Sequence, residues 1–280
     1  MLRRAFQILG TILPNSYFPV FWKKAIYQGP LKGICAPLMN CFACPLATVH
    51  CPIGALQHFV AVSKIPYYII GYLSIIGLSV GRMACGWICP FGFFQDLIAK
   101  IKVKKRKLRF PTYLAYLRYV FLVVGVIALP LITHEHWFSK LCPWGTIEAG
   151  IPWVIWSQDI RNMIGGLYYI KILILVLFLG LMVFFKRPFC FLMCPLGAIF
   201  SLFNKLSILR LGVDTESCTK CNRCLRNCPV GIKVYEDPNN HNCIRCLECT
   251  KCSAVRVYSI FSKNQMTRDE YAEAIWDMKE

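Results

Sequence analysis

The sequence holds 17 cysteines in 280 residues, and five of them open the motif C-P-x-G. These five are Cys51, Cys89, Cys142, Cys194 and Cys228. Further cysteines stand four residues upstream of three of the copies. Thiolates at such short spacings are the ligands of iron–sulfur clusters. The sequence therefore predicts a protein that binds iron and whose chemistry is the transfer of electrons.

The densest run of cysteines is Cys218, Cys221, Cys224 and Cys228, followed by Pro229. This spacing lets one loop aim three thiolates at a cubane while the fourth thiolate reaches a neighbouring cluster. A second run follows a few residues later and consists of Cys243, Cys246, Cys249 and Cys252. Zinc is the alternative metal, since paired C-x2-C motifs also hold tetrahedral zinc. The C-P dipeptide and the repeated short gaps favour cubanes.

Through these eight cysteines, residues 210–262 resemble the two-cluster bacterial-type ferredoxins, which are small α+β domains. The resemblance implies that Cys252 completes the group of the first run and that Cys228 completes the group of the second. The second run departs from the family pattern, because its last gap is two residues and Ser253 stands in place of proline.

Composition places the rest of the chain in a membrane. Hydrophobic residues make up 56% of the sequence and mean hydropathy is +0.49, which is too apolar for an ordinary soluble domain. Segments long enough to cross a hydrocarbon core of about 30 Å as helices are Pro66–Arg82, Thr112–Thr133 and Leu167–Phe185. Ala5–Trp22 is a fourth, although Pro14 and Pro19 interrupt it. We expect residues 1–209 to form an all-α polytopic membrane domain with about four transmembrane helices.

The distribution of Lys and Arg orients these spans. The segment 100–109 has seven basic residues in ten, and such loops stay on the cytoplasmic side. With four spans, both termini and the ferredoxin-like tail are then cytoplasmic, and residues 23–64 and 134–166 face outward. Arg3 and Arg4 also suggest a signal peptide or twin-arginine export signal, but no small-residue cleavage site follows. Nucleic acid is not expected to be a partner, because the net charge of +18 collects beside the spans, where it meets membrane lipid.

Two C-x3-C-P motifs directly follow spans on the cytoplasmic side. They supply Cys85, Cys89, Cys190 and Cys194, which is enough for one [4Fe-4S] cluster that bridges two spans. Together with the tail, CGWICPFG and CFLMCPLG resemble the membrane ferredoxin-type quinol dehydrogenase subunits of periplasmic nitrate and nitrous-oxide reduction systems. The resemblance implies transfer of electrons between membrane quinol, or a cytoplasmic donor, and an acceptor beyond the membrane.

The outward-facing loops add five more cysteines. Because the inner group draws on both halves of the chain, we expect an outer cluster to do likewise and to use Cys41, Cys44, Cys51 and Cys142. Cys35 is then the spare thiol, and a set of Cys35, Cys41, Cys44 and Cys51 is the alternative. Disulfides or zinc are further alternatives for this side, because outward-facing cysteines in oxidising compartments usually pair.

Sixteen cysteines thus predict four [4Fe-4S] clusters: two in the tail, one at the inner face and one at the outer face. Clusters on both faces would divide the membrane crossing into short electron-transfer steps. Basic residues of the tail would favour an acidic cytoplasmic donor such as a ferredoxin, or a flavoprotein. They are Lys220, Arg223, Arg226, Lys233, Arg245 and Lys251.

Three functions compete on this evidence, and in each the chain is an electron-transfer protein or a subunit of an oxidoreductase complex. In the first, a cytoplasmic donor reduces an extracytoplasmic or membrane acceptor. In the second, the chain is a quinol dehydrogenase and needs a quinone pocket beside one cluster. In the third, it assembles or reduces metal centres, with His134 and His136 as the candidate outer ligands. Residues 263–280 form an amphipathic tail, and the sequence leaves the oligomeric state open.

Overall fold

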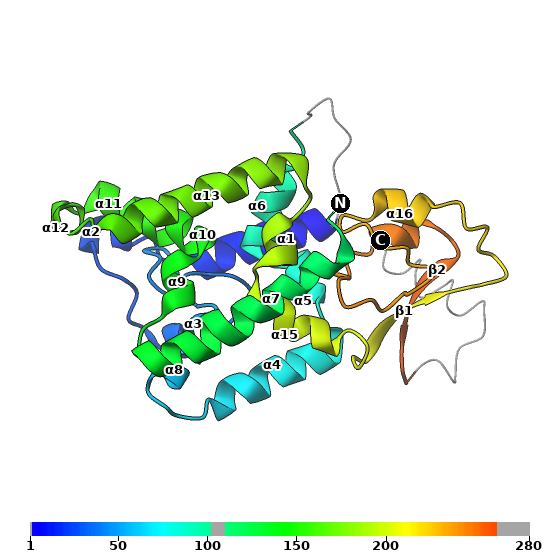
Figure 1. Cartoon of the computed structure of the whole chain (residues 1–280), viewed down its shortest axis with the longest axis horizontal. Helices are drawn as coiled ribbons and strands as arrows, with labels where there is room; N and C mark the ends of the chain where they lie inside the picture. Colours follow the sequence, from blue (N-terminus) through cyan, green and yellow to red (C-terminus); the bar gives the residue numbers. More distant parts are fainter. Residues whose placement is uncertain (1, 102–109, 262–280) are drawn as a thin grey trace.

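The computed structural model describes residues 2–101 and 110–261, and the chain is mostly helical. Figure 1 shows a larger helical part that holds α1 to α15 and, beside it, a smaller part that holds β1, β2 and α16. The expected amphipathic tail 263–280 and most of the basic segment 100–109 lie outside the described residues.

Helices of the larger part follow one another with short connections. In its first half they are α1 Leu2–Ile12, α2 Val20–Lys23, α3 Pro52–Ala61, α4 Tyr67–Val80, α5 Met83–Trp87 and α6 Pro90–Ile98. In its second half they are α7 Leu117–Val120, α8 Leu129–Thr133, α9 Trp137–Leu141, α10 Pro143–Gly145, α11 Ile151–Trp156, α12 Gln158–Asn162, α13 Gly166–Phe184, α14 Pro188–Leu192 and α15 Pro195–Phe203. Short 3-10 segments are η1 Leu13–Asn15, η2 Pro30–Gly33 and η3 Thr112–Tyr116, and the π-helical segments are η4 Phe121–Ala128 and η5 Thr146–Gly150.

Among the residues that the structure describes, two helices are long and apolar enough to cross a membrane. One is the continuous rod Thr112–Thr133, which passes from η3 through α7 and η4 to α8, and the other is α13. Their side chains include exposed apolar residues such as Val123, Ile132 and Leu173, which a lipid environment would cover. Helix α4 is apolar but has only 14 residues, and in Figure 1 it lies below the rod Thr112–Thr133, with α13 on the opposite side of that rod.

The expected span Ala5–Trp22 is not one continuous helix. Helix α1 ends at Ile12, a single 3-10 turn carries Pro14 and Asn15, and α2 starts only at Val20. Proline lacks an N–H and cannot continue the hydrogen-bond ladder, which accounts for the break. The 11 residues of α1 extend about 16 Å, about half of a hydrocarbon core.

The smaller part is framed by a two-stranded antiparallel sheet. Strand β1, Leu209–Val213, pairs with β2, Val255–Ser259, with Leu211 opposite Val257. The cysteine loops, the short helix α16 (Arg223–Asn227) and the turn η6 (Glu248–Lys251) lie between these strands in sequence. The sheet therefore closes the base of the cysteine-rich loops and holds their two ends together.

Candidate metal centres

Four of the five C-P-x-G motifs have the same local structure. Cys51, Cys89, Cys142 and Cys194 are each the N-cap of a helix whose first residue is the following proline. Proline suits this position because the N–H that it lacks would have no partner there. The free amides and the helix dipole favour negative charge at such an end, and Gly197 N–H donates to Cys194 Sγ over 3.3 Å. The motif thus presents a thiolate where an anionic cluster is stabilised.

The arginine that precedes each inner motif forms a hydrogen bond with the other inner motif. An arginine stands three residues before the first cysteine of each motif. The Arg82 guanidinium donates to the carbonyl of Cys190 over 3.1 Å, while that of Arg187 donates to the carbonyl of Cys85 over 2.8 Å. A Cβ on Gly197 would lie 2.9 Å from the Arg82 guanidinium, so this close approach requires glycine. These two hydrogen bonds connect the two halves of the chain at the inner cysteines.

The inner cysteines Cys85, Cys89, Cys190 and Cys194 are all buried. Burial, together with the thiols of Cys190 and Cys85, raises the pKa of the Cys89 thiol to about 12, which places these side chains near one another. Buried Gln95 also donates to Cys190 Sγ over 3.1 Å. The structure thus gathers the group that the sequence predicted, and polar donors surround its sulfurs.

Unpartnered cationic atoms mark this site as one for an anion. Arg82 and Arg118 are each 1% exposed. Within the described residues, Nε of both arginines and Nη1 of Arg118 have no hydrogen-bond partner. Arg118 also interacts electrostatically with the Cys194 thiol. Since buried charges are normally paired, the donor set fits a four-thiolate iron–sulfur cluster, which carries negative charge.

A third buried arginine connects the inner group to the tail. The Arg187 guanidinium binds both carboxylate oxygens of Asp96 over 2.8 Å each. Burial lowers the pKa of Arg187, but Asp96 and then the thiols of Cys190 and Cys246 raise it above its ordinary value. Arg187 therefore lies near both an inner cysteine and a tail cysteine.

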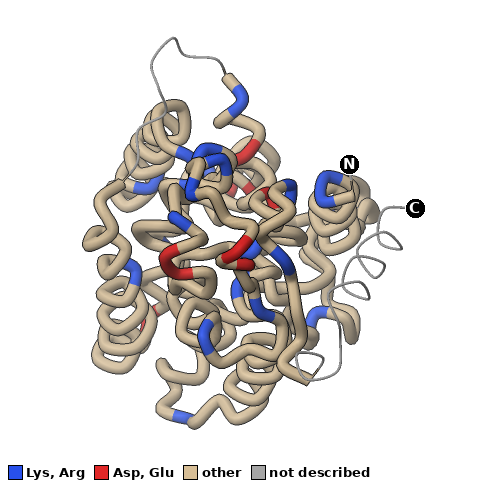
Figure 2. Tube along the Cα trace, turned by 90° about the vertical axis from the view of Figure 1, so that its right-hand side faces the viewer, with Lys and Arg blue, Asp and Glu red and all other residues tan. Residues whose placement is uncertain are grey.

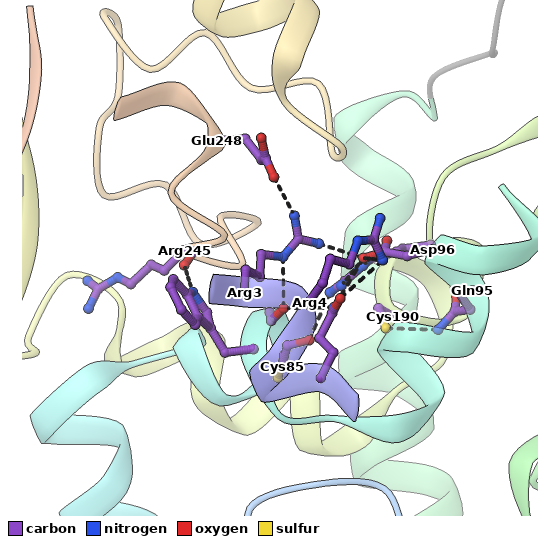
Figure 3. Close-up of polar contacts among 12 residues, drawn as sticks. Arg3, Arg4, Cys85, Gln95, Asp96, Cys190, Arg245 and Glu248 are labelled. Carbon is purple, nitrogen blue, oxygen red and sulfur yellow. Dashed lines mark hydrogen bonds and ion pairs between the residues drawn. The ribbon is translucent and has the colours of Figure 1, made fainter. Parts of the chain in front are cut away.

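Arg3 extends this network across three segments of the chain. Figure 3 shows its guanidinium between Asp96 and Glu248, and it also donates to the carbonyl of Gly86. Glu248 belongs to the tail, Asp96 to α6 and Arg3 to α1. The network joins the tail to helices α1 and α6 of the helical part.

We expect Asp96→Asn to lower the free energy of unfolding by about 3–5 kcal/mol, because it leaves Arg187 buried without its carboxylate. Burial raises the pKa of Asp96, yet Arg187 and Arg3 hold it well below its usual range. A lowered carboxyl pKa means that this contribution is present above the unfolded pKa and is lost as pH falls through the folded one.

Thermal unfolding of the detergent-solubilised protein measures this effect. The matched control is Glu135→Gln, because Glu135 forms an exposed ion pair with Lys140. The control should change stability by at most about 1 kcal/mol. Equal loss in both variants would mean that the buried pair has no special role.

The outer cysteines gather near the opposite end of the helical part. Burial raises the pKa of Cys142 to about 12, with Cys41 contributing, and the Cys41 thiol in turn contributes at Cys44. Glu148 accepts a hydrogen bond from the Cys41 amide over 2.7 Å and fixes this loop. The Cys142 thiol also contributes to the raised pKa of Cys51. These four thiols are the set that the sequence favoured.

Cys35 is set apart from that group. Its Sγ lies 3.4 Å from Nε2 of His50, with which Cys35 forms an isolated β-bridge. Burial alone raises the pKa of Cys35 to about 11, with no contribution from another thiol. All 17 cysteines are free, so the structure contains none of the disulfides considered for the outer side.

The outer and inner groups adjoin one another. Burial chiefly raises the pKa of Cys51, and the thiols of Cys142 and then Cys89 raise it further. The rings of Trp144, which follows Cys142 in sequence, and Phe91, which follows Cys89, stack with centroids 4.9 Å apart. Cysteines from both groups also belong to one continuous buried core.

A cavity of about 830 Å³ lies against the outer group. Cys41, Cys51 and Cys142 line it together with many apolar and aromatic side chains from α3, α9, α11 and the start of α13. These helices lie in the half of the helical part that is remote from the tail in Figure 1. The volume and lining are those of a site for a small organic molecule.

The two cysteine loops of the tail have one backbone shape. The residues on either side of the middle cysteine are left-handed in both: φ is 52° at Lys220 and 58° at Asn222, then 46° at Arg245 and 58° at Leu247. Non-glycine residues adopt this conformation rarely, so its recurrence points to a shared function. Cys228, Cys243, Cys246 and Cys249 line one small internal cavity.

That cavity groups Cys228 with the second run, as the ferredoxin resemblance implied. Amide groups face its sulfurs, with Arg245 N–H donating to Cys243 Sγ and Ile232 N–H to Cys228 Sγ, each over 3.4 Å. Cys224 and Cys252 belong to one small core in the tail. Within the described residues, no three side chains of His, Cys, Asp or Glu are close enough to hold a single metal ion. A cubane spreads its ligands over several irons and needs no such closeness.

Arg245 corrects one expectation for the tail surface. It is only 2% exposed, and its guanidinium donates to the carbonyls of Val80 and Asn204, while its own carbonyl accepts from Trp87. Arg245 is therefore a docking residue between tail and helices and not part of an exposed basic surface. The other five basic residues of that prediction are exposed. Figure 2, which faces the tail, shows more basic than acidic positions there.

Comparisons with known proteins decide the family. The family described as a 4Fe-4S binding domain matches residues 48–66, 69–110 and 169–213. An uncharacterised protein of Methanocaldococcus jannaschii is 32% identical over 207 residues, which cover 70% of this chain and 79% of the relative. The chain belongs to the ferredoxin-type 4Fe-4S electron-transfer family.

Two other relatives of this ferredoxin-type protein carry informative names. The ferredoxin-type protein NapH of Escherichia coli is 25% identical over 235 residues, or 82% of this chain and 74% of the relative. The methylamine utilization ferredoxin-type protein MauN of Methylobacillus flagellatus is 25% identical over 162 residues, or 58% and 52%. No solved structure matches the chain significantly. The family prediction made from the motifs is thereby confirmed.

Sequence reasoning overlooked the polar residues that support the cysteines of this ferredoxin-type protein. They are Arg82, Gln95, Asp96, Arg118, Glu148 and Arg187. A signal was available for Arg82 and Arg187, because both inner motifs read R-x2-C-x3-C-P-x-G. Their partners were not predictable, since each arginine bonds the other motif and not its own.

Proposed function

We propose that this ferredoxin-type protein holds four [4Fe-4S] clusters in a membrane and carries electrons from a cytoplasmic donor to a quinone at the outer side. The inner ligands are Cys85, Cys89, Cys190 and Cys194, and the outer ligands are Cys41, Cys44, Cys51 and Cys142. The tail ligands are Cys218, Cys221, Cys224 and Cys252 for one cluster and Cys228, Cys243, Cys246 and Cys249 for the other. When bound, these clusters supply one-electron chemistry.

The observation that carries the proposal is the unbroken series of neighbouring cysteines. The Cys142 thiol interacts electrostatically with Cys51, Cys51 with Cys89, and Cys89 with Cys190. Arg187 then lies next to both Cys190 and Cys246 of the tail. Such a series crosses the helical part in steps that are short compared with a hydrocarbon core of about 30 Å.

The two ends of the series suit different partners. At the tail, Cys221 is exposed and lies beside Arg223 and Arg226, which favours a small acidic redox protein as donor. At the other end, the apolar cavity beside Cys51 suits a lipid-soluble quinone. We assign the membrane location from the two long apolar helices and the exposed apolar residues on them.

Anaerobic mixing with duroquinone tests this function. Protein that has been reduced and freed of reductant should be reoxidised at the cluster absorption bands, and a Cys51→Ala, Cys142→Ala variant should react at least tenfold more slowly. The variant measures any direct attack of quinone on the exposed tail. Equal rates would contradict the proposal, because quinone would then react somewhere other than the outer cavity.

Quinol oxidation is the second candidate function, and the same cavity favours it. It differs only in the direction of electron flow, so duroquinol should then reduce the oxidised protein. Reduction of the tail clusters by duroquinol, with no reoxidation by duroquinone, would favour this second function over the first.

A further inference from the structure

Two histidines from different helical segments meet at the wall of the outer cavity. The rings of His58, on α3, and His136, next to α9, stack with centroids 5.7 Å apart and planes within 16° of parallel. Both line the cavity with Cys51 and Cys142. A stacked imidazole pair beside a candidate redox centre is unlike the rest of the cavity lining, which is mostly apolar.

We propose that His58 and His136 exchange the protons that accompany electron transfer to a quinone in this cavity, an inference that rests on the proposed function. Reduction of a quinone to a quinol takes two electrons and two protons. The electrons come one at a time through the cysteine-held outer site, and the two protons are added to the carbonyl oxygens. The imidazole pair donates these protons and is recharged from water.

The position of the pair suits a proton relay. Both rings line the cavity, and since His58 is exposed while His136 is half-buried, the pair connects the cavity wall to solvent. Within the described residues, the other charged or titratable groups around the cavity are His50, Lys140 with its ion-pair partner Glu135, the candidate ligands Cys41, Cys51 and Cys142, and Tyr168 and Lys171 of α13. Burial lowers the pKa of His136, and His58 and Lys140 lower it further.

The chain supplies a matched control in His134. This histidine is exposed and near in sequence, but its Nδ1 lies 2.6 Å from the Ala61 carbonyl and it does not line the cavity. A substitution there removes an imidazole from the same loop without removing one from the pair.

The experiment measures reoxidation of reduced protein by duroquinone in the wild type, His58→Gln, His136→Gln, the double variant and His134→Gln. General acid catalysis contributes about 10²–10⁴-fold, so we expect the double variant to be about 100-fold slower and His134→Gln to be unchanged. The wild-type rate should fall as pH rises through the lowered pKa of His136, and this dependence should vanish in the double variant. Reduction of every variant by dithionite checks that the clusters are intact.

Each outcome decides something different. Unchanged rates and pH profiles in the paired variants, with the wild type still faster than Cys51→Ala, Cys142→Ala, would refute the proton relay alone. If the wild type reacts no faster than that cysteine variant, the proposed quinone function fails and the relay with it. Loss of rate in His134→Gln to the same extent would assign the effect to loop structure and overturn the relay.

Discussion

Alanine at both Cys51 and Cys142 is expected to lower the iron content of anaerobically purified protein from about 16 to about 12 atoms per chain. Acid-labile sulfide should fall in parallel. The reason is geometric, because these two thiols come from different halves of the chain and complete one group with Cys41 and Cys44. The other twelve assigned cysteines are untouched by the substitutions.

Cys35→Ala is the matched control for this prediction. Cys35 is buried like the outer ligands, but it lies against His50, and no other thiol contributes to its raised pKa. We expect Cys35→Ala to keep about 16 iron atoms. Iron loss in Cys35→Ala, with retention in the Cys51 and Cys142 variant, would assign the outer site to the wrong cysteines.

Arg118→Gln is expected to lower the midpoint potential of the inner cluster by about 50–100 mV. One charge near the cluster in an effective dielectric of about 20 contributes about 2 kcal/mol, and a one-electron couple shifts by about 59 mV per 1.4 kcal/mol. Arg118 is 1% exposed and has two guanidinium nitrogens without partners in the part of the chain that the structure describes. Its positive charge therefore stabilises the more negative, reduced cluster.

Redox titration followed by electron paramagnetic resonance measures this shift. The control is Lys205→Gln, which removes a charge from the exposed side of the chain just after α15, where water screens it. The control should shift the potential by no more than a small fraction of the effect at Arg118. A potential that is unchanged in Arg118→Gln would mean that the orphaned guanidinium faces something other than the cluster.

Local chemistry was readable from the sequence wherever a motif carries its own geometry. Cysteine followed by proline predicts a helix start, and four of five C-P-x-G motifs form one. The resemblance of the tail to two-cluster ferredoxins implied that Cys228 joins the second run, and the structure places Cys228 in a cavity with Cys243 and Cys246. Whether these thiols hold iron stays a prediction.

Contacts between segments that are distant in sequence could not be predicted in the same way. Arg82 and Arg187 precede their own motifs but bond the opposite ones, which no local spacing reveals. Arg245 looked like a surface cation beside cysteines, yet it is buried because backbone carbonyls of Val80 and Asn204 accept its hydrogen bonds. The break in the first span follows from Pro14, whereas the outer cavity depends on segments more than 100 residues apart.

Transmembrane electron transfer in sealed vesicles tests the central claim most directly. The protein is reconstituted with ferricyanide trapped inside, and a reduced soluble ferredoxin is added outside under anaerobic conditions, so that electrons must cross the bilayer to bleach the trapped dye. The proposal predicts bleaching by the wild type and none above the empty-vesicle rate by the Cys51→Ala, Cys142→Ala variant. Equal bleaching by both proteins, or none by a wild type that retains its iron, would contradict a continuous electron path through the outer cysteines.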